Sequence, residues 1–383
     1  MQHLLKWGML ILFALALVAL SVYLSNPSGT TSRQTGIKLS DVLGDINIEG
    51  YTRAFEPREF SFPADHGLHP GYKHEWWYFT GNLATPQGRH FGFQLTFFRI
   101  ALAPHSKARD SAWATNQIYM AHFTLTDVEN KKFYNVERFS RAGLGLADAT
   151  AQPFKVWLED WSAAGQGAQT FPLHLRAANN DIAIDLHLDA LKPVVLQGDK
   201  GLSQKSGEPG NASYYYSLTR LGTTGTVRVG EKTFPVSGLS WMDREWSTSA
   251  LSKEQAGWDW FSLQLSDGRD VMFYRLRRKD GQPDPHSAGA LVAPDGTKKS
   301  LSLQGVQIAS AGEWRSPHSG IRYPVRWRLR IPSEKLDLQI TPYLADQELN
   351  VSVRYWEGAV RIEGTTDGKP IKGDGYVEMT GYN

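Results

Sequence analysis

Cysteine is absent from the 383-residue sequence. Without it the chain has no disulfide bond, no thiolate metal site, no cysteine nucleophile and no lipid anchor attached through cysteine. An excess of one charge is missing too, because 41 Lys and Arg residues are balanced by 39 Asp and Glu residues, for a net charge of +2. No basic stripe or block stands out, so the sequence lacks the electrostatic signature of a nucleic-acid-binding protein.

The common cofactor and nucleophile motifs are missing as well. The chain has no Gly-rich phosphate loop, no G-x-S-x-G elbow and no dinucleotide-binding motif. We therefore predict no cofactor. What the sequence does contain is a 41% hydrophobic fraction with 13 tryptophans, which is typical of a packed protein and not of a disordered one.

The first 24 residues carry a targeting signal. Lys6 precedes an uncharged apolar run from Trp7 to Leu24, which just reaches the length that spans a bilayer. The run is either a cleaved signal peptide or an uncleaved membrane anchor, and in both cases the body is exported. We expect a periplasmic or extracellular protein, tethered to the inner membrane by residues 7–24 if the segment is not cleaved. Polar residues 25–49 are predicted to form a linker.

Period-two alternation dominates from about residue 50 onward. Residues 173–188 and 323–340 each fit two alternating strands joined by a polar or Pro-containing turn. Gly and Pro turns recur, and no sustained helical stripe interrupts them. Many short strands at regular spacing predict an all-β barrel or sandwich.

An internal repeat predicts two related β domains. The stretch "WWYFTGNLATPQGRHFGFQL" (76–95) resembles "WDWFSLQLSDGRDVMFYRL" (258–276), with a Gly-Arg turn in both copies. We interpret the repeat as a duplicated opening hairpin and expect a first domain over 50–250 and a second over 251–383. Chance similarity between two aromatic strands is the alternative interpretation.

His74 and Glu75 stand directly before four aromatic residues in "HPGYKHEWWYFTGNL" (69–83), whereas the repeat has Ala256-Gly257 there. The ionisable pair is therefore an addition to the aromatic framework. A glutamate in an aromatic barrel lumen would have a raised pKa and could act as a general acid. The alternative is a structural glutamate paired with a buried arginine.

A second candidate lies in "SGLSWMDREWSTS" (237–249), where Asp243 and Glu245 share one face of a strand. Two carboxyl groups at positions i and i+2 push their pKa values apart, so that one stays protonated near neutrality. The alternative is a solvated ion pair with Arg244. The segment falls at the predicted domain junction, which favours a ligand site.

A group of histidines is the candidate for a metal site. His66, His69 and His74 follow one another at short spacing, and His122 in "YMAHFTLTD" could join them. The glycines and prolines around the first three indicate irregular structure, and no paired metal motif accompanies them. We predict ordinary hydrogen-bonded histidines and no metal.

Five long motifs follow one another over roughly residues 50–383: "HPGYKHEWWYFTGNL", "FGFQLTFFR", "AHFTLTD", "SGLSWMDREW" and the closing "YWEGAVRIEG…GDGYVEMTGY". Together they resemble the AttH-like/carotenoid 1,2-hydratase family. The resemblance implies an exported protein of two tandem lipocalin-like, calycin-type antiparallel β-barrel domains, here preceded by the N-terminal hydrophobic helix.

The resemblance implies two functions. Many members are encoded beside an ABC transporter of the lipoprotein-releasing or macrolide-export type. These members imply an accessory protein that binds a hydrophobic lipid or isoprenoid ligand and has the transporter permease as partner. A smaller branch adds water across the terminal double bond of acyclic carotenoids. For such a hydration, an acid protonates the alkene and aromatic faces stabilise the carbocation.

The sequence departs from the hydratase branch at two places. Arg244 stands where that branch has a histidine, and Tyr274-Arg275-Leu276 lacks the acid of its Tyr-x-Asp motif. Arginine does not deprotonate in proteins and cannot shuttle a proton. We therefore expect a ligand carrier first, a hydratase or hydrolase second, and a scaffold without a cavity third.

The candidate site is predicted to be an apolar cavity opening between Glu75 and residues 241–246. Its candidate catalytic residues are Glu75, Asp243, Glu245 and His74. Its candidate ligand-binding residues are Trp76, Trp77, Tyr78, Arg99, His122, Trp241, Arg244, Trp246 and Tyr274.

Overall fold

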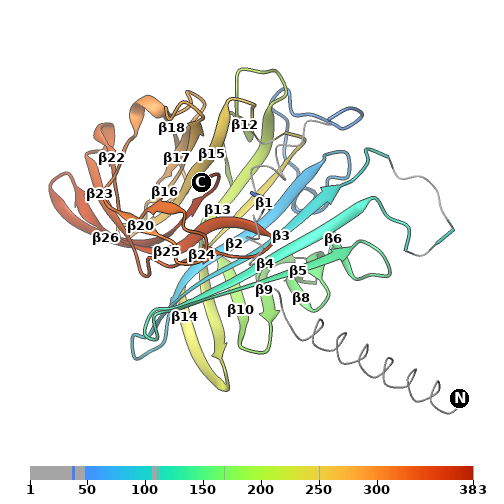
Figure 1. The fold of residues 1–383 in the computed structure, drawn as a ribbon, viewed down its shortest axis with the longest axis horizontal. Coiled ribbons are helices and arrows are strands. Elements are labelled where there is room, and N and C mark those ends of the chain that lie inside the picture. Colours follow the sequence, from blue (N-terminus) through green and yellow to red (C-terminus); the bar gives the residue numbers. More distant parts are fainter. Residues whose placement is uncertain are drawn as a thin grey trace, which may run out of the picture. The chain divides into compact units, whose positions relative to one another are not determined.

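The computed structural model describes residues 37–38, 48–105, 110–111, 113–167, 169–249 and 251–382. Within these residues the chain is built almost entirely of β-strands, which form two large sheets (Figure 1). Helical structure in the same residues is limited to the short 3₁₀ helices η1 (Ala64–His66), η2 (Leu303–Gly305) and η3 (Pro332–Glu334). No helix in the described ranges is both long and apolar enough to cross a membrane. The predicted all-β fold is confirmed.

The predicted N-terminal hydrophobic helix, residues 1–24, lies outside the described residues. Most of the predicted linker 25–49 lies outside them too. Within it, β1 (Ile37–Lys38) pairs in parallel with β25 (Val353–Thr366). Cleavage or anchoring of the N-terminal segment therefore stays a prediction.

The first sheet is antiparallel and has the order β5-β4-β3-β2-β14-β13-β10-β9-β8-β7-β6, with β11 and β12 added along β13. Its strands in the described residues are β2 (His74–Ala84), β3 (His90–Ala101), β4 (Gln117–Asp127), β5 (Lys132–Arg141), β6 (Ala147–Ala151), β7 (Phe154–Leu158), β8 (Trp161–Gln166), β9 (Gln169–Ala178), β10 (Ile182–Ala190), β11 (Val195–Leu196), β12 (Leu202–Gln204), β13 (Ala212–Val229) and β14 (Lys232–Ser247).

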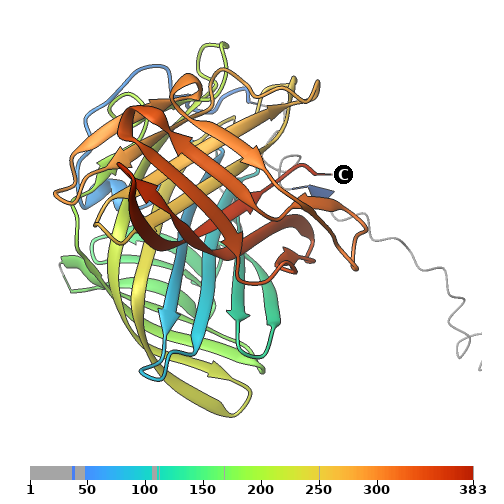
Figure 2. The same ribbon diagram turned by 90° about the vertical axis from the view of Figure 1, so that its left-hand side faces the viewer.

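The second sheet has the order β18-β17-β16-β15-β26-β25-β23-β22-β19, with β1 and β24 added along β25. Its further strands in the described residues are β15 (Gln255–Leu265), β16 (Asp270–Arg278), β17 (Ala288–Val292), β18 (Lys298–Ser302), β19 (Gln307–Ser310), β22 (Trp327–Ile331), β23 (Leu336–Pro342), β24 (Glu348–Leu349) and β26 (Lys369–Met379). A separate small hairpin joins β20 (Glu313–Arg315) to β21 (Arg322–Pro324). Both sheets curve strongly (Figure 2), and each forms a nearly closed, lipocalin-like barrel around its own core, as expected.

Both hairpins expected from alternation are present. β9 and β10 pair so that Leu173 faces Leu188 and Leu175 faces Leu186. β22 and β23 are joined through η3, which contains Pro332 as expected for the turn. The spacing of apolar residues therefore predicted the two strands of each hairpin and the turn between them, because one face of each hairpin had to be buried.

The two copies of the repeat occupy equivalent places. In the first sheet β2 lies between β3 and the last strand, β14; in the second sheet β15 lies between β16 and the last strand, β26. This equivalence supports a duplicated opening hairpin. The residue limits of the two domains stay a prediction.

The alternation of β2 and β15 decides where a site can form. Trp77 and Phe79 of β2 belong to the first core, and Phe261 of β15 belongs to the second. The opposite faces of these strands meet each other, with the rings of Tyr78 and Trp260 in a T-shaped contact at 5.1 Å. The outer faces of the two barrels therefore share a third, aromatic cluster between them.

Candidate active site

A pocket opens between the outer faces of the two barrels. It encloses about 740 Å³, open solvent at its mouth included. Nearly half of its lining residues are aromatic, and they come from both sheets: Trp76, Tyr78, Phe98, Tyr215, Trp258, Trp260 and Tyr274. The apolar cavity that the aromatic strand led us to expect in a barrel lumen therefore lies between the barrels.

Four carboxyl groups line this aromatic pocket: Asp243 and Glu245 of β14, Glu357 of β25 and Glu378 of β26. Asp243 and Glu245 share a face because side chains two residues apart on a strand point the same way. Glu357 and Glu378 are direct cross-strand partners. Asp243, Glu245 and Glu357 are buried, whereas Glu378 is only partly buried in the pocket wall.

Asp243 titrates near neutrality. Its Oδ2 accepts a hydrogen bond from the Tyr215 hydroxyl at 2.5 Å, and its Oδ1 accepts one from Ser217 at 2.6 Å and one from Trp241 Nε1 at 2.7 Å. Burial raises the pKa of Asp243 to about 7 although these three donors lower it. The pKa of Asp243 is raised as the pattern predicts, but burial is the main cause and the charge of Glu245 contributes least.

The pKa values of Glu357 and Glu378 are both raised. Burial raises the pKa of Glu378 to about 8, against the hydrogen bond that Trp258 Nε1 donates at 2.7 Å. Burial, and then the facing Glu378, raise the pKa of Glu357 well above its usual value. The Tyr78 hydroxyl is hydrogen-bonded to Glu357. The pocket therefore contains carboxylic acids able to give up a proton.

Glu245 is held differently from the other three acids. Lys205 Nζ lies 3.0 Å from its Oε1, and the Ser213 hydroxyl donates to the same oxygen. Burial disfavours the Lys205 ammonium, but Glu245, Tyr274 and Asp243 together outweigh it and raise the pKa of Lys205. The ammonium also lies 4.2 Å from the ring centroid of Tyr274, within cation–π range. Glu245 is thus a neutralised ion-pair partner in the pocket wall.

Glu75 lies on the opposite face of β2, inside the first barrel, and does not line the pocket. Arg99 and Arg244 both form ion pairs with its carboxylate. The backbone N–H of His69 approaches both carboxylate oxygens at 3.2 Å. Burial alone would raise the pKa of Glu75, but the two arginine charges outweigh it and hold that pKa far below its usual range. The predicted raised pKa of Glu75 is wrong, and the alternative of a buried structural ion pair is correct.

Arg99 and Arg244 therefore lie inside the first barrel, where they pair with Glu75, and they do not line the pocket. Their predicted role as ligand-binding residues is wrong for this pocket. The Arg99 guanidinium also donates to the Tyr72 carbonyl at 2.6 Å. The Arg244 guanidinium stacks 3.9 Å from the ring centroid of Trp77. The predicted ion pair between Arg244 and a carboxylate exists, but its partner is Glu75 and the pair is buried.

The remaining candidates divide into two groups. Trp76, Tyr78 and Tyr274 line the pocket as predicted, and Trp241 supports it by donating to Asp243. The others are buried but do not line it: Trp77 in the first core, Trp246 stacked on His69, His122 hydrogen-bonded to Tyr355, and His74 on β2.

Sequence reasoning missed Glu357, Glu378 and Lys205. A usable signal exists for the two glutamates. Each stands in an alternating aromatic segment of the closing hairpin, "YWEG" and "YVEM". At the turn of this hairpin Thr366 pairs with Lys369. Counting nine residues back from Thr366 and nine forward from Lys369 reaches Glu357 and Glu378, which are therefore opposite each other. Lys205 offers no comparable signal, because it follows the short strand β12 in an irregular segment.

These features define a lipocalin-like two-barrel protein with an apolar, acid-containing pocket between its barrels. The chain belongs to the AttH-like family, whose sequence profile matches residues 53–382. A solved AttH structure from Nitrosomonas europaea is 34% identical, with a TM-score of 0.77 over 87% of this chain and 100% of that one.

A hydratase is among the similar proteins. Kievitone hydratase of Fusarium solani subsp. phaseoli is 26% identical over 218 residues, 54% of this chain. The aligned part spans 60% of the length of that enzyme. The crystal structure of kievitone hydratase from Nectria haematococca has a TM-score of 0.65 at 15% identity, over 87% of this chain and 96% of that one. At that identity the likeness concerns the fold. The chain is hydratase-like in sequence and fold.

Proposed function

We propose that the protein is a hydratase that adds water across a carbon–carbon double bond of an apolar, isoprenoid-like substrate. The observation that carries the proposal is the coexistence in one aromatic pocket of Glu378, with a pKa of about 8, and Asp243, with a pKa of about 7. At neutral pH such a pair supplies a general acid and a general base together. The similarity to kievitone hydratase supports the reaction type.

The Glu378 carboxylic acid protonates the alkene in the first step. The C=C π bond breaks, a C–H bond forms, and the adjacent carbon becomes a carbocation. The indole rings of Trp258 and Trp260 and the phenol of Tyr274 line the pocket and stabilise this cation through their π faces. Water then attacks the cation, and the Asp243 carboxylate takes the proton that the bound water loses. Return of a proton from Asp243 to Glu378 resets the site.

The two departures from the carotenoid-hydratase branch bear differently on this chemistry. Arg244 faces the first barrel interior, where it pairs with Glu75, so the substitution there removes no group from the pocket. Leu276 does line the pocket, and it stands where that branch carries the acid of Tyr-x-Asp. The pocket therefore keeps acid chemistry but offers an apolar contact at that position, which favours a substrate other than a carotenoid.

The test is product analysis in ¹⁸O-labelled water. Kievitone and lycopene, an acyclic carotenoid, are each incubated with residues 26–383, and products are analysed by mass spectrometry. The proposal expects a product heavier by one labelled water from at least one substrate, and its loss with Asp243→Asn. If both substrates bind and are recovered unchanged, the proposal fails for this substrate class.

Binding without chemistry is the second candidate function. The same aromatic pocket would hold a lipid or isoprenoid ligand, and the Glu245–Lys205 ion pair leaves its wall without a net charge from those two groups. In the form that the family resemblance implies, this candidate is an exported carrier that serves an ABC exporter permease. Recovery of unchanged bound ligand in the preceding experiment is the result that favours it.

A further inference from the structure

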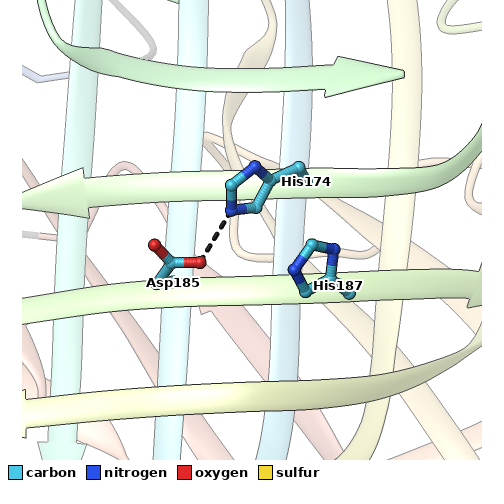
Figure 3. A group of neighbouring side chains, drawn as sticks. All are labelled: His174, Asp185 and His187. Atoms are coloured by element: carbon cyan, nitrogen blue, oxygen red, sulfur yellow. Dashed lines mark hydrogen bonds and ion pairs between the residues drawn. The ribbon is translucent and has the colours of Figure 1, made fainter. Parts of the chain in front are cut away.

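A second group of ionisable side chains lies on the outer face of the first sheet, on β9 and β10. His174, Asp185 and His187 each offer one ligand atom, and these atoms lie within 4.8 Å of one another. Figure 3 shows the three side chains on the same side of the two strands, with His174 directed toward Asp185. We propose that this group binds one divalent transition-metal ion.

The strand register builds the group. His174 and His187 are direct cross-strand partners, and Asp185 precedes His187 by two residues, so all three share a face. The imidazole rings stack with centroids 4.5 Å apart and 8° between their planes. His174 Nε2 lies 2.7 Å from Asp185 Oδ1. The ligands therefore come from two rigid, paired strands and are held close together before any ion binds.

The donor set specifies the class of ion. Two imidazole nitrogens and one carboxylate oxygen suit Zn²⁺, Cu²⁺ or Ni²⁺, whereas Ca²⁺ and Mg²⁺ prefer oxygen ligands. Zn²⁺ holds such ligands at about 2.0–2.2 Å, so binding would draw the three side chains closer by rotation. The side chains of His174 and Asp185 retain 31% and 44% exposure, which leaves them free to rotate and leaves water access for a fourth ligand.

The neighbours across the strands are small or neutral, with one exception. Ala164 of β8 faces His174, and Thr224 of β13 faces His187. The exception is Arg176, whose Nε lies 3.2 Å from Asp185 Oδ2. Its positive charge opposes a divalent cation and occupies one carboxylate oxygen. Removing Arg176 should therefore strengthen metal binding, which a purely structural hydrogen-bond network would not predict.

The experiment is isothermal titration of Zn²⁺ into the chelator-treated protein after removal of any affinity tag. One saturable site per chain is expected. His174→Gln, His187→Gln and Asp185→Asn should each weaken it by more than the roughly 10- to 100-fold that loss of an outer-shell partner causes. Arg176→Gln should tighten it. None of these residues lines the pocket. The rate of hydration and the circular dichroism spectrum of each variant should therefore match those of the unaltered protein.

His318 provides a matched control, because it forms an exposed pair with Asp346 at 3.2 Å and lies between β20 and β21, away from β9 and β10 in sequence. His318→Gln should leave Zn²⁺ affinity unchanged. Absence of saturable binding in the unaltered protein overturns the proposal, as does an affinity in His174→Gln and His187→Gln equal to that of the unaltered protein. Circular dichroism of each variant distinguishes loss of a ligand from loss of the fold.

Discussion

Glu357 and Glu378 face each other directly across β25 and β26, and both line the pocket between the two barrels. Burial raises the pKa of both carboxyl groups, and neighbouring charges add to it: Glu378 acts on Glu357, whereas Asp243 and Glu245 act on Glu378. The closing hairpin of the second barrel therefore brings two carboxyl groups with raised pKa values into the pocket. The first barrel contributes Asp243 to the same pocket, so the site requires both barrels.

The first prediction concerns stability at Glu378. A carboxyl group whose pKa is raised in the folded state contributes stability at low pH. That stability is lost as the pH rises from the pKa of the unfolded chain, about 4.3, to the pKa in the folded protein, which for Glu378 is about 8. Glu378→Gln should therefore raise the free energy of unfolding at pH 8, by an amount on the order of a few kcal/mol, because it removes the cost of ionising a buried carboxyl group. Urea denaturation measures it. The same comparison at pH 4 should show no gain, and a gain of equal size there would contradict the account.

The second prediction concerns the Glu75 ion pairs. Glu75→Gln leaves Arg99 and Arg244 buried without their shared carboxylate, which should cost about 3–5 kcal/mol of stability. The lowered pKa of Glu75 makes this contribution present above about pH 4.5 and lost as pH falls below it. Chemical denaturation at pH 7 provides the measurement.

A matched acid-to-amide control is available at Asp367, whose pair with Lys335 is exposed. Asp367→Asn should change stability by at most about 1 kcal/mol. Because Glu75 does not line the pocket, Glu75→Gln should leave ligand binding intact wherever the variant remains folded. A Glu75→Gln protein as stable as the unaltered one would show that the ion pairs are not structural.

The third prediction concerns Asp243 as the general base. Asp243→Asn keeps the shape of the side chain and removes its basicity, so hydration should fall by about 10²–10⁴-fold while ligand affinity changes little. Turnover and quenching of the pocket tryptophans measure the two effects separately. Comparable losses in turnover and affinity would assign Asp243 to binding instead.

The fourth prediction is the pH dependence of hydration. Asp243 must be ionised, so the rate rises through pH about 7, and Glu378 must be protonated, so the rate falls above pH about 8. The profile should be bell-shaped with its maximum between these values. The apparent pKa values read from its two limbs include the interactions among the carboxyl groups of the pocket. Ser217→Ala removes a donor that lowers the pKa of Asp243, so the acidic limb should move to higher pH. An acidic limb unchanged in this variant would exclude Asp243 as its source.

The sequence allowed the fold to be predicted further than the site. Alternation at residues 173–188 predicted a hairpin, and the repeat at 76–95 and 258–276 marked two strands that occupy equivalent places in their sheets. Period-two burial is a local property of a strand, so a single sequence records it.

The site depends on contacts that a single strand does not encode. Alternation along a strand puts Glu75 and Tyr78 on opposite faces, but it does not say which face meets a cavity and which meets Arg99. Asp243 was identified because two acids two residues apart share a face within one segment. Glu357 and Glu378 lie 21 residues apart in sequence and meet through the closing hairpin. Counting back from the turn of that hairpin could have paired them, but their raised pKa values depend on burial between the barrels, which a single strand does not encode.

The most direct measurement is the infrared spectrum of the protein at pH 7, compared with those of Glu357→Gln and Glu378→Gln. The account predicts a carbonyl stretch of protonated carboxylic acid that persists at neutral pH in the unaltered protein and loses intensity in both variants. A spectrum without this band at pH 7, or a band unchanged in both variants, would show that the pocket holds no acid able to protonate an alkene.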